Sequence, residues 1–272
     1  MHINPLQLIL GFLLGAAIGG LAWKAKALSR SGALAATLTG GLIFGLGGFP
    51  WAVLLLAFFI SSSALSRAFA RRKAALSEKF SKGSQRDWGQ VLANGGLGAG
   101  LAVAQSIFPG QAWPWVAFAG AMSAVNADTW ATELGVLSSR LPVLITTGKD
   151  VERGASGGVS TLGTLSALAG AGLVSALASL VFPLGHALPL LAIGAGAGLA
   201  GALFDSLLGA TVQAIYRCPA CQKETERHPL HSCGTATVQI RGWRWLNNDL
   251  VNFGCSAAGA LAAAGLWRLL IG

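Results

Sequence analysis

Residues 113–138 read WPWVAFAGAMSAVNADTWATELGVLS, an apolar segment that ends in a cluster of polar side chains. Its length fits a membrane-spanning helix, which needs about 20 mainly apolar residues. The cluster holds the amide of Asn126, the carboxylates of Asp128 and Glu133, and the hydroxyl groups of Thr129 and Thr132. Charged groups are costly at membrane depth, so they usually line a bundle interior or a water-filled cavity. The segment therefore predicts a membrane helix with a functional site. The simpler alternative is a buried polar patch whose members only form hydrogen bonds with one another.

The composition supports a membrane protein. Of the 272 residues, 53% are hydrophobic and only 11% are charged, whereas soluble domains carry about 25% charged residues. The 38 Gly residues are typical of closely packed membrane helices. The formal net charge is +9, but the basic residues lie in loops between apolar blocks. This placement favours a role in membrane orientation over nucleic acid binding.

The apolar blocks predict an all-α bundle of about eight Gly-rich membrane spans, which forms one integral membrane domain over residues 1–272. We expect the spans at residues 5–23, 31–48, 50–69, 88–108, 113–138, 158–181, 186–215 and 247–271. The second and fourth spans are especially rich in Gly, so each is expected to be either continuous or broken and re-entrant.

The loops between the predicted spans alternate in charge. Those after spans one, three, five and seven carry all of the 19 Lys and Arg residues except Arg268, including Arg71, Arg72 and Lys73 in the second basic loop. The positive-inside rule places these loops in the cytoplasm and both termini outside. We expect the inner membrane of a bacterium as the location.

The third basic loop contains a Gly-rich stretch, residues 146–160, with the sequence TTGKDVERGASGGVS. Backbone N–H groups near Ser156, Gly157 and Gly158 and the start of the next helix suit an anion. Lys149 and Arg153 would complete a phosphate cradle. The GK[ST] ending of a Walker A loop is absent, and an ordinary turn between helices remains the alternative.

Polar residues also recur at helical spacing near the ends of three other predicted spans. They are Arg86, Gln90 and Asn94 before and within span four, Asp205 in span seven, and Asn248, Asp249 and Asn252 at the start of span eight. Capping of a helix N-terminus is the alternative for the residues at span starts. Hard oxygen ligands of this kind suit Mg²⁺, which usually takes one or two carboxylates plus substrate phosphates.

These observations predict one site at the cytoplasmic ends of the spans. We expect Asp128, Glu133, Asp205 and Asp249 to be catalytic, and Asp128, Asp205 and Asp249 to bind Mg²⁺. We expect substrate or nucleotide contacts from Arg86, Gln90, Asn94, Asn126, Thr129, Lys149, Arg153, Ser156, Gly157, Gly158, Asn248 and Asn252. Asp128 and Glu133 are separated by about 140° around one helix, so Glu133 is expected to face a neighbouring group instead of the metal.

The fourth basic loop, residues 216–246, contains a CPAC sequence followed by two His residues and a third Cys. Cys218, Cys221 and Cys233 with one His fit a tetrahedral structural Zn²⁺ site in a cytoplasmic zinc-knuckle loop. His231 is the expected fourth ligand, and His228 is an equal candidate by spacing. A redox-active CxxC is the rival interpretation, but no thioredoxin-like pattern surrounds it.

The motifs resemble those of an integral-membrane family that includes plant phytyl-phosphate kinase of the vitamin E pathway. The resemblance rests on QVLANG at 90–95, ADTWATELG at 127–135, TT at 146–147 with GASGGVS at 154–160, DSLLGA at 205–210 and NNDLVN at 247–252. It implies phosphoryl transfer from a nucleoside triphosphate, CTP in related polyprenol kinases, to an isoprenoid monophosphate. The expected partners are therefore membrane lipids, a prenyl phosphate and a nucleotide.

Two other functions fit parts of the sequence. Gly-rich spans with polar groups inside them are typical of transporters, so a transporter or flippase of a lipid phosphate or another anion is the main alternative. A non-catalytic scaffold that docks through the Cys/His loop is the third. In the kinase hypothesis, the prenyl tail lies between spans, where small residues leave grooves.

Overall fold

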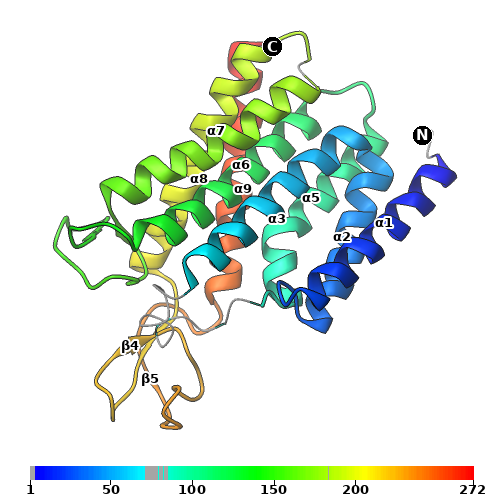
Figure 1. The fold of residues 1–272 in the computed structure, drawn as a ribbon. Coiled ribbons are helices and arrows are strands. Elements are labelled where there is room, and N and C mark those ends of the chain that lie inside the picture. The colour runs from blue at the N-terminus through cyan, green and yellow to red at the C-terminus, as the bar shows by residue number, and fades with distance from the viewer. Residues whose placement is uncertain (1–3, 71–78, 80–81, 83–84, 183) are drawn as a thin grey trace.

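The computed structural model describes residues 4–70, 79, 82, 85–182 and 184–272, which form a helix bundle with two small sheets (Figure 1). The basic residues Arg71, Arg72 and Lys73 lie outside the described residues. The helices are α1 (Pro5–Lys24), α2 (Arg30–Gly47), α3 (Phe49–Ala68), α5 (Trp88–Ile107), α6 (Trp113–Gly135), α7 (Thr161–Val181), α8 (Ala187–Thr211) and α9 (Asn248–Leu270). They coincide with the predicted spans, which confirms the membrane helix bundle.

The largest differences from the predicted boundaries lie where a turn or a short strand replaces a helix end. Helix α6 ends at Gly135 and a turn follows it. Helix α7 begins only at Thr161, because residues 158–159 form strand β2 (Gly158–Val159), which pairs antiparallel with β1 (Val143–Leu144). Strand β3 (Ile215–Arg217) lies between β4 (Glu224–Thr225) and β5 (Val238–Arg241), so α8 ends at Thr211. The expectation of span residues up to 138, from 158 and up to 215 was therefore wrong at these three ends.

The two especially Gly-rich helices, α2 and α5, are continuous. The chain turns sharply at Gly48, whose φ of +80° favours glycine, and α3 starts at the next residue. Glycines of α1 bring that helix against α2. A Cβ atom added to Gly11 would lie 2.7 Å from the carbonyl oxygen of Gly41. These glycines therefore allow close contact between helices, and they do not break them.

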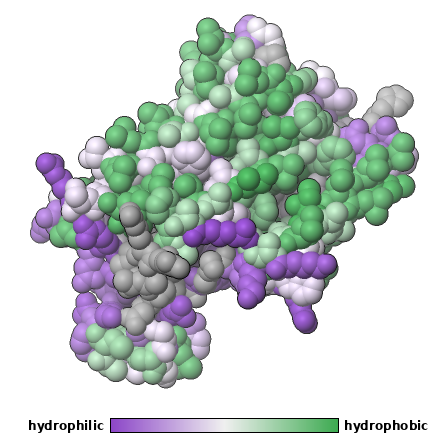
Figure 2. Space-filling model, viewed as in Figure 1, coloured by the Kyte–Doolittle hydropathy of each residue, from purple (hydrophilic) through white to green (hydrophobic). Residues whose placement is uncertain are grey.

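Long apolar helices and their outward side chains identify an integral membrane protein. Within the described residues, α1, α3, α7, α8 and α9 are long and apolar enough to cross a membrane. Large apolar side chains such as Leu13 on α1, Leu180 on α7 and Leu269 on α9 are exposed. Strands β3, β4 and β5 belong to a small lobe, residues 215–241, which also holds the Cys/His sequence. Figure 2 shows apolar residues over the helices and hydrophilic residues gathered at the end that carries this lobe.

Helix α6 is the centre of the bundle, and it carries the polar cluster from Asn126 to Glu133. It contacts α3, α5, α7, α8 and α9, and every residue from Pro114 to Ala127 is buried. Its N-terminal half belongs to an apolar core in which Trp51 stacks on Phe118 with ring centroids 4.3 Å apart. Because apolar side chains fill that half of the bundle, the polar C-terminal end of α6 is the end open to ligands.

The start of α1 and the end of α9 lie on the same side of the bundle, opposite β4 and β5 (Figure 1). With the basic loops inside, the positive-inside rule predicts that both ends lie outside the cytoplasm. An alkaline phosphatase reporter fused after Gly272 should therefore be active in a bacterial host, whereas the same reporter inserted at Gly148 should be inactive. Activity only at Gly148 would contradict this orientation.

Candidate functional site

A polar cavity of about 490 Å³ lies where the ends of α5, α6, α7, α8 and α9 meet the loops. Its size is within the range of small-molecule sites. The residues of the predicted site that line it are Arg86, Gln90, Asn94, Asp128, Thr129, Glu133, Arg153, Ser156, Gly157, Gly158, Asp205, Asn248 and Asn252. The fold thus brings these residues, which are up to 166 positions apart in the sequence (Arg86 and Asn252), around one cavity.

Carboxylates from three elements meet in this cavity. Asp128 on α6 and Asp205 on α8 are joined by Glu226, which follows strand β4 and was not predicted. Asp205 lies close enough to Asp128 and Glu226 for both to repel its negative charge. Among the described residues, its buried Oδ2 atom has no hydrogen-bond partner. The three residues are half-buried, and a set of oxygen donors that repel one another fits a hard divalent cation.

Glu133 faces α3 and Arg86, as its angular separation from Asp128 predicts. Its Oε1 atom accepts a 2.7 Å hydrogen bond from the Ser66 hydroxyl. The Arg86 guanidinium donates to Ser63 Oγ at 3.0 Å and lies 5.7 Å from the ring centroid of Phe58. Burial lowers the pKa of Arg86, and the negative charge of Glu133 opposes that shift. An Arg side chain keeps its charge in such surroundings, so Arg86 is a fixed cation in the cavity wall.

The Gly-rich loop forms another wall because it lies directly on α8. Gly157 has a φ of +84°, and a Cβ atom added there would lie 2.5 Å from the Cα atom of Ala210. The neighbouring Ser156 hydroxyl donates to Glu226 Oε1 at 3.0 Å. The Gly158 N–H donates to the Ala155 carbonyl at 3.0 Å, so it is already used within a turn. Its expected role as a phosphate donor is therefore not supported.

Asn126 and Lys149 are not among the residues that line the cavity. Asn126 is fully buried, where its Oδ1 atom accepts from the Ser61 hydroxyl at 2.9 Å and its amide donates to the Gly170 carbonyl at 2.8 Å. It ties α6 to α3 and α7. Lys149 is exposed because the β1–β2 loop carries it away from the bundle. Arg153 lines the cavity and also donates to the Ser138 carbonyl at 2.9 Å.

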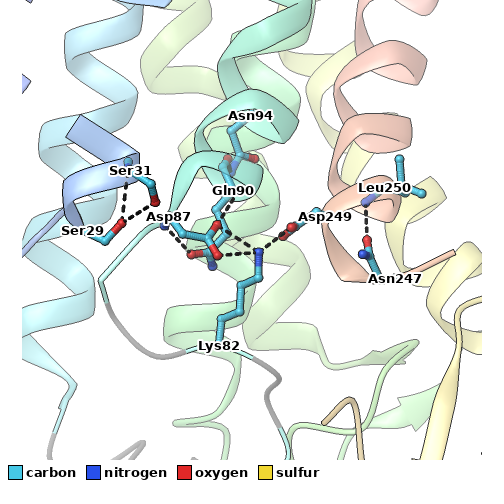
Figure 3. Close-up of polar contacts among 10 residues, drawn as sticks. Ser29, Ser31, Lys82, Asp87, Gln90, Asn94, Asn247, Asp249 and Leu250 are labelled. Carbon is cyan, nitrogen blue, oxygen red and sulfur yellow. Dashed lines mark hydrogen bonds and ion pairs between the residues drawn. The ribbon is translucent and has the colours of Figure 1, made fainter. Parts of the chain in front are cut away.

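Asp249 forms an ion pair instead of lining the cavity. Figure 3 shows the Lys82 side chain reaching between Asp87, at the start of α5, and Asp249, at the start of α9. The Lys82 Nζ atom lies 2.8 Å from Asp87 Oδ2 and 2.5 Å from Asp249 Oδ2. A Cβ atom on Gly89 would lie 2.5 Å from the same Asp249 oxygen. The other oxygen of this carboxylate, Oδ1, is buried and has no hydrogen-bond partner among the described residues. Asp249 thus joins α5 to α9 through one oxygen, and its expected role in Mg²⁺ binding stays a prediction.

Lys82 was not predicted because it lies in a charged loop with no regular spacing. Burial acts to lower its pKa, but hydrogen bonds to Asp249 and Asp87 outweigh burial and raise it. Asp87 is also the N-cap of α5, and it forms a capping box with Gln90. Burial acts to raise the pKa of Asp87, whereas Lys82 and the Gln90 backbone lower it overall. The three charges thus join the N-terminal ends of α5 and α9.

The Cys/His loop contains a cluster that can hold a metal ion. One ligand atom from each of Cys218, Cys221, His231 and Cys233 lies within 4.8 Å of the others. The Cys221 N–H donates to Cys218 Sγ at 3.4 Å. The hydrogen bond with Thr235, followed by that with His231, lowers the pKa of Cys233 to about 5. Thiolate is the form that binds metal.

The structure distinguishes the two candidate histidines. His231 Nδ1 lies 3.2 Å from Cys233 Sγ. His228 instead stacks on Tyr216, with ring centroids 4.5 Å apart. His231 is therefore the member of the cluster, as predicted, and His228 serves the packing of the lobe.

The Cys/His cluster is joined to the cavity by the β3–β4 hairpin. Cys218 and Cys221 lie in the turn between these strands, and Glu226 and Arg227 follow β4 directly. Both Glu226 and Arg227 line the cavity. Glu226 Oε1 accepts from Gln213 Nε2 at 3.0 Å, which fixes the hairpin on the end of α8. The lobe thus supplies charged groups to the site.

Fold and cavity define an integral membrane protein with a polar, charged site at one end of its helix bundle. The chain belongs to the integral membrane protein family DUF92, whose sequence pattern it matches over residues 13–260. This membership confirms the family resemblance drawn from the motifs.

Relatives in the family come from a plant, an archaeon and a cyanobacterium. The chain is 35% identical to Protein PGR of Arabidopsis thaliana over 277 residues, which cover 93% of this chain and 94% of the plant protein. An uncharacterised membrane protein of Methanocaldococcus jannaschii is 34% identical over 187 residues, 69% of this chain and 75% of its own. One from Synechocystis is 31% identical over 235 residues, 85% and 79% of the two chains. No solved structure matches this chain.

The Lys82 ion pairs predict a pH-dependent contribution to stability. Replacing Lys82 by Met should lower the free energy of unfolding at neutral pH by about 1 kcal/mol, as expected for a partly exposed pair. The raised pKa of Lys82 makes its contribution present below about pH 10.4 and lost above it. The lowered pKa of Asp87 makes its contribution present above about pH 3.9 and lost as the pH falls further.

Thermal unfolding in detergent at several pH values measures this difference. The exposed Lys149→Met variant is the control and should unfold like the unmodified protein. A difference between Lys82→Met and the unmodified protein that grows below pH 4 would contradict the assignment.

The Cys/His cluster predicts about one bound metal ion per chain, as expected for a four-ligand site. Metal analysis of the purified protein should show loss of this metal in Cys218→Ser and His231→Ala. The matched variant His228→Ala should retain it because its ring lies against Tyr216. Loss of metal in His228→Ala with retention in His231→Ala would overturn the ligand set.

Proposed function

We propose that this protein is a Mg²⁺-dependent kinase that converts an isoprenoid monophosphate to the diphosphate. CTP or another nucleoside triphosphate would be the donor, and the reaction would take place on the cytoplasmic face of the inner membrane. The observation that carries the proposal is the single cavity in which Asp128, Asp205 and Glu226 meet Arg86 and Arg153. Transfer of a phosphoryl group requires acids that hold a metal ion and cations that offset the phosphate charge, both in one partly enclosed space.

The reaction needs positioning and charge compensation more than acid–base chemistry. An oxygen of the acceptor phosphate bonds to the γ-phosphorus of the donor, the bond from γ-phosphorus to the bridging oxygen breaks, and a nucleoside diphosphate leaves. The attacking oxygen is already ionised, so no side chain has to remove a proton. A cavity without a histidine among its lining residues is consistent with this chemistry.

The acids of α6 and α8 are the best candidates to hold the metal. Asp128 and Asp205 would bind Mg²⁺, because the buried Asp205 Oδ2 has no other partner among the described residues. When bound, Mg²⁺ would supply positive charge that offsets the charge of the donor phosphates. Glu226 would hold Ser156 and Gln213 in place through its two hydrogen bonds.

The cations and amides would bind the two phosphate groups. Arg86, which precedes α5, and Arg153, in the Gly-rich loop, both line the cavity and would compensate phosphate charge. Asn94, Asn248 and Asn252 would donate hydrogen bonds from the ends of α5 and α9. Glu133 would orient Arg86 and would not contact the metal. We also propose that the metal of the Cys/His cluster is a structural Zn²⁺, because its ligands leave no evident open position.

The transporter or flippase alternative is less consistent with the packing. A transport path would have to continue through the half of the bundle where Trp51, Trp115 and Phe118 are buried. In the described residues this core is closely packed, and Trp115 and Phe118 have no exposed surface. The polar lining of the cavity comes from one end of the helices only.

The proposal predicts kinase activity that depends on Asp128. Purified protein with geranylgeranyl or phytyl monophosphate, Mg²⁺ and CTP or ATP should form the diphosphate, detected by mass spectrometry. Asp128→Asn should lower kcat at least about 100-fold, as for loss of a major electrostatic contact in the transition state. The control Asp150→Asn changes an exposed acid of the β1–β2 loop and should keep full activity.

Two results would contradict the proposal. One is the absence of diphosphate with every nucleotide while vesicles that contain the protein move a lipid phosphate across the bilayer. The other is equal activity of Asp128→Asn and Asp150→Asn with both proteins folded.

A further inference from the structure

A second cavity of about 340 Å³ lies between α1, α2, α3 and α5. Apolar side chains and glycines form nearly all of its lining, and the polar exceptions are Thr39, Arg86, Gln90 and Asn94. The Thr39 hydroxyl already donates to the Ala35 carbonyl at 2.9 Å. The cavity is therefore suited to an apolar ligand everywhere except at one end.

That polar end is shared with the first cavity. Arg86, Gln90 and Asn94 line both cavities, so the charged space and the apolar space meet at the start of α5. The Arg86 side chain matches this border, because its guanidinium lies 5.7 Å from the ring centroids of Phe58 and Phe59. A molecule with a phosphate at one end and an apolar chain at the other would fit the pair of cavities.

The apolar cavity is elongated along the helices. Its lining on α3 runs from Phe49 to Phe59, which corresponds to about 15 Å at 1.5 Å per residue. Arg86 and Leu28 mark one end, and Phe44 and Phe49 mark the other. The cavity thus extends from the polar site toward the opposite side of the bundle.

We propose that this cavity binds the apolar tail of the lipid whose phosphate group enters the polar cavity. The identity of that lipid as an isoprenoid monophosphate rests on the proposed function, but the tail site itself does not require turnover. A membrane already offers the tail an apolar surrounding. The cavity therefore adds little affinity and instead selects the tail by length and shape.

Two glycines keep the cavity open. A Cβ atom at Gly40 would lie 3.8 Å from Leu55 Cδ2, and one at Gly95 would lie 3.9 Å from Thr39 Oγ1. Both distances are ordinary contacts, so a larger side chain at either position would extend into the cavity without disturbing the backbone. In contrast, a Cβ atom at Gly15 would lie 2.9 Å from the Thr37 carbonyl oxygen. Gly40 and Gly95 are therefore the positions at which the cavity can be filled selectively.

The test uses a C20 prenyl monophosphate with a diazirine in its tail, bound to the detergent-solubilised full chain. After illumination, mass spectrometry should place the cross-links on α2 and α3 residues that line the cavity. Gly40→Leu and Gly95→Leu should each lower the cross-link yield about tenfold, as expected when a close-packed site is overfilled. The matched controls Gly20→Leu and Gly100→Leu add the same side chain where nothing lies within 4 Å and should keep the yield within about twofold.

The outcomes separate the tail site from the kinase. Cross-links in the cavity without diphosphate formation would support the tail site and contradict the kinase. Diphosphate formation with cross-links on other helices would overturn the tail site and leave the kinase intact. Equal yields in Gly40→Leu, Gly95→Leu and the two controls would also overturn the tail site. It would likewise be overturned if an ordinary membrane phospholipid stayed bound in the cavity when the probe is added. Thermal unfolding checks that each variant is folded, and either cavity variant alone suffices for the test.

Discussion

The placement of Asp128 and Asp205 in one cavity, at the end of a buried helix, is the constraint on which the site depends. An ionised carboxylate at membrane depth is unfavourable by about 3 kcal/mol, and two that repel each other are worse. Arg86, which lies against α3, offsets the charge of Glu133 in the same cavity. The buried Oδ2 atom of Asp205 still has no hydrogen-bond partner among the described residues. A bound divalent cation would satisfy it, and the loops around the cavity provide charge for the anion that such a cation attracts.

The loops act as structural parts of the site because each is anchored to the helix bundle. Gly157 allows the Gly-rich loop to touch α8 at Ala210. Glu226 joins that loop to the Cys/His lobe through Ser156. Lys82 joins the starts of α5 and α9. In the proposed function, a metal bound by the Cys/His cluster would support the site by holding the β3–β4 hairpin, which Glu226 follows directly.

Much of the fold could be predicted from the sequence, because eight apolar blocks and alternating basic loops carry strong signals. The strands could not, since β1, β2 and β4 are only two residues long. Residues at regular helical spacing, such as Gln90 with Asn94 and Asn248 with Asn252, do line one cavity. Lys82 and Glu226 were missed because they lie in loops, where no spacing shows which way a side chain points. Helical spacing also gave no sign of the tertiary partners that engage Asn126 and Asp249.

The proposed function is tested most directly by finding where a divalent cation binds. The structure should be determined with Mn²⁺ in place of Mg²⁺ and a non-hydrolysable nucleoside triphosphate, and anomalous scattering should locate the manganese. We expect one manganese ion at Asp128 and Asp205, with the donor phosphates directed toward Arg86 and Arg153. Manganese and nucleotide bound elsewhere, with no ion in the polar cavity, would contradict the proposed function.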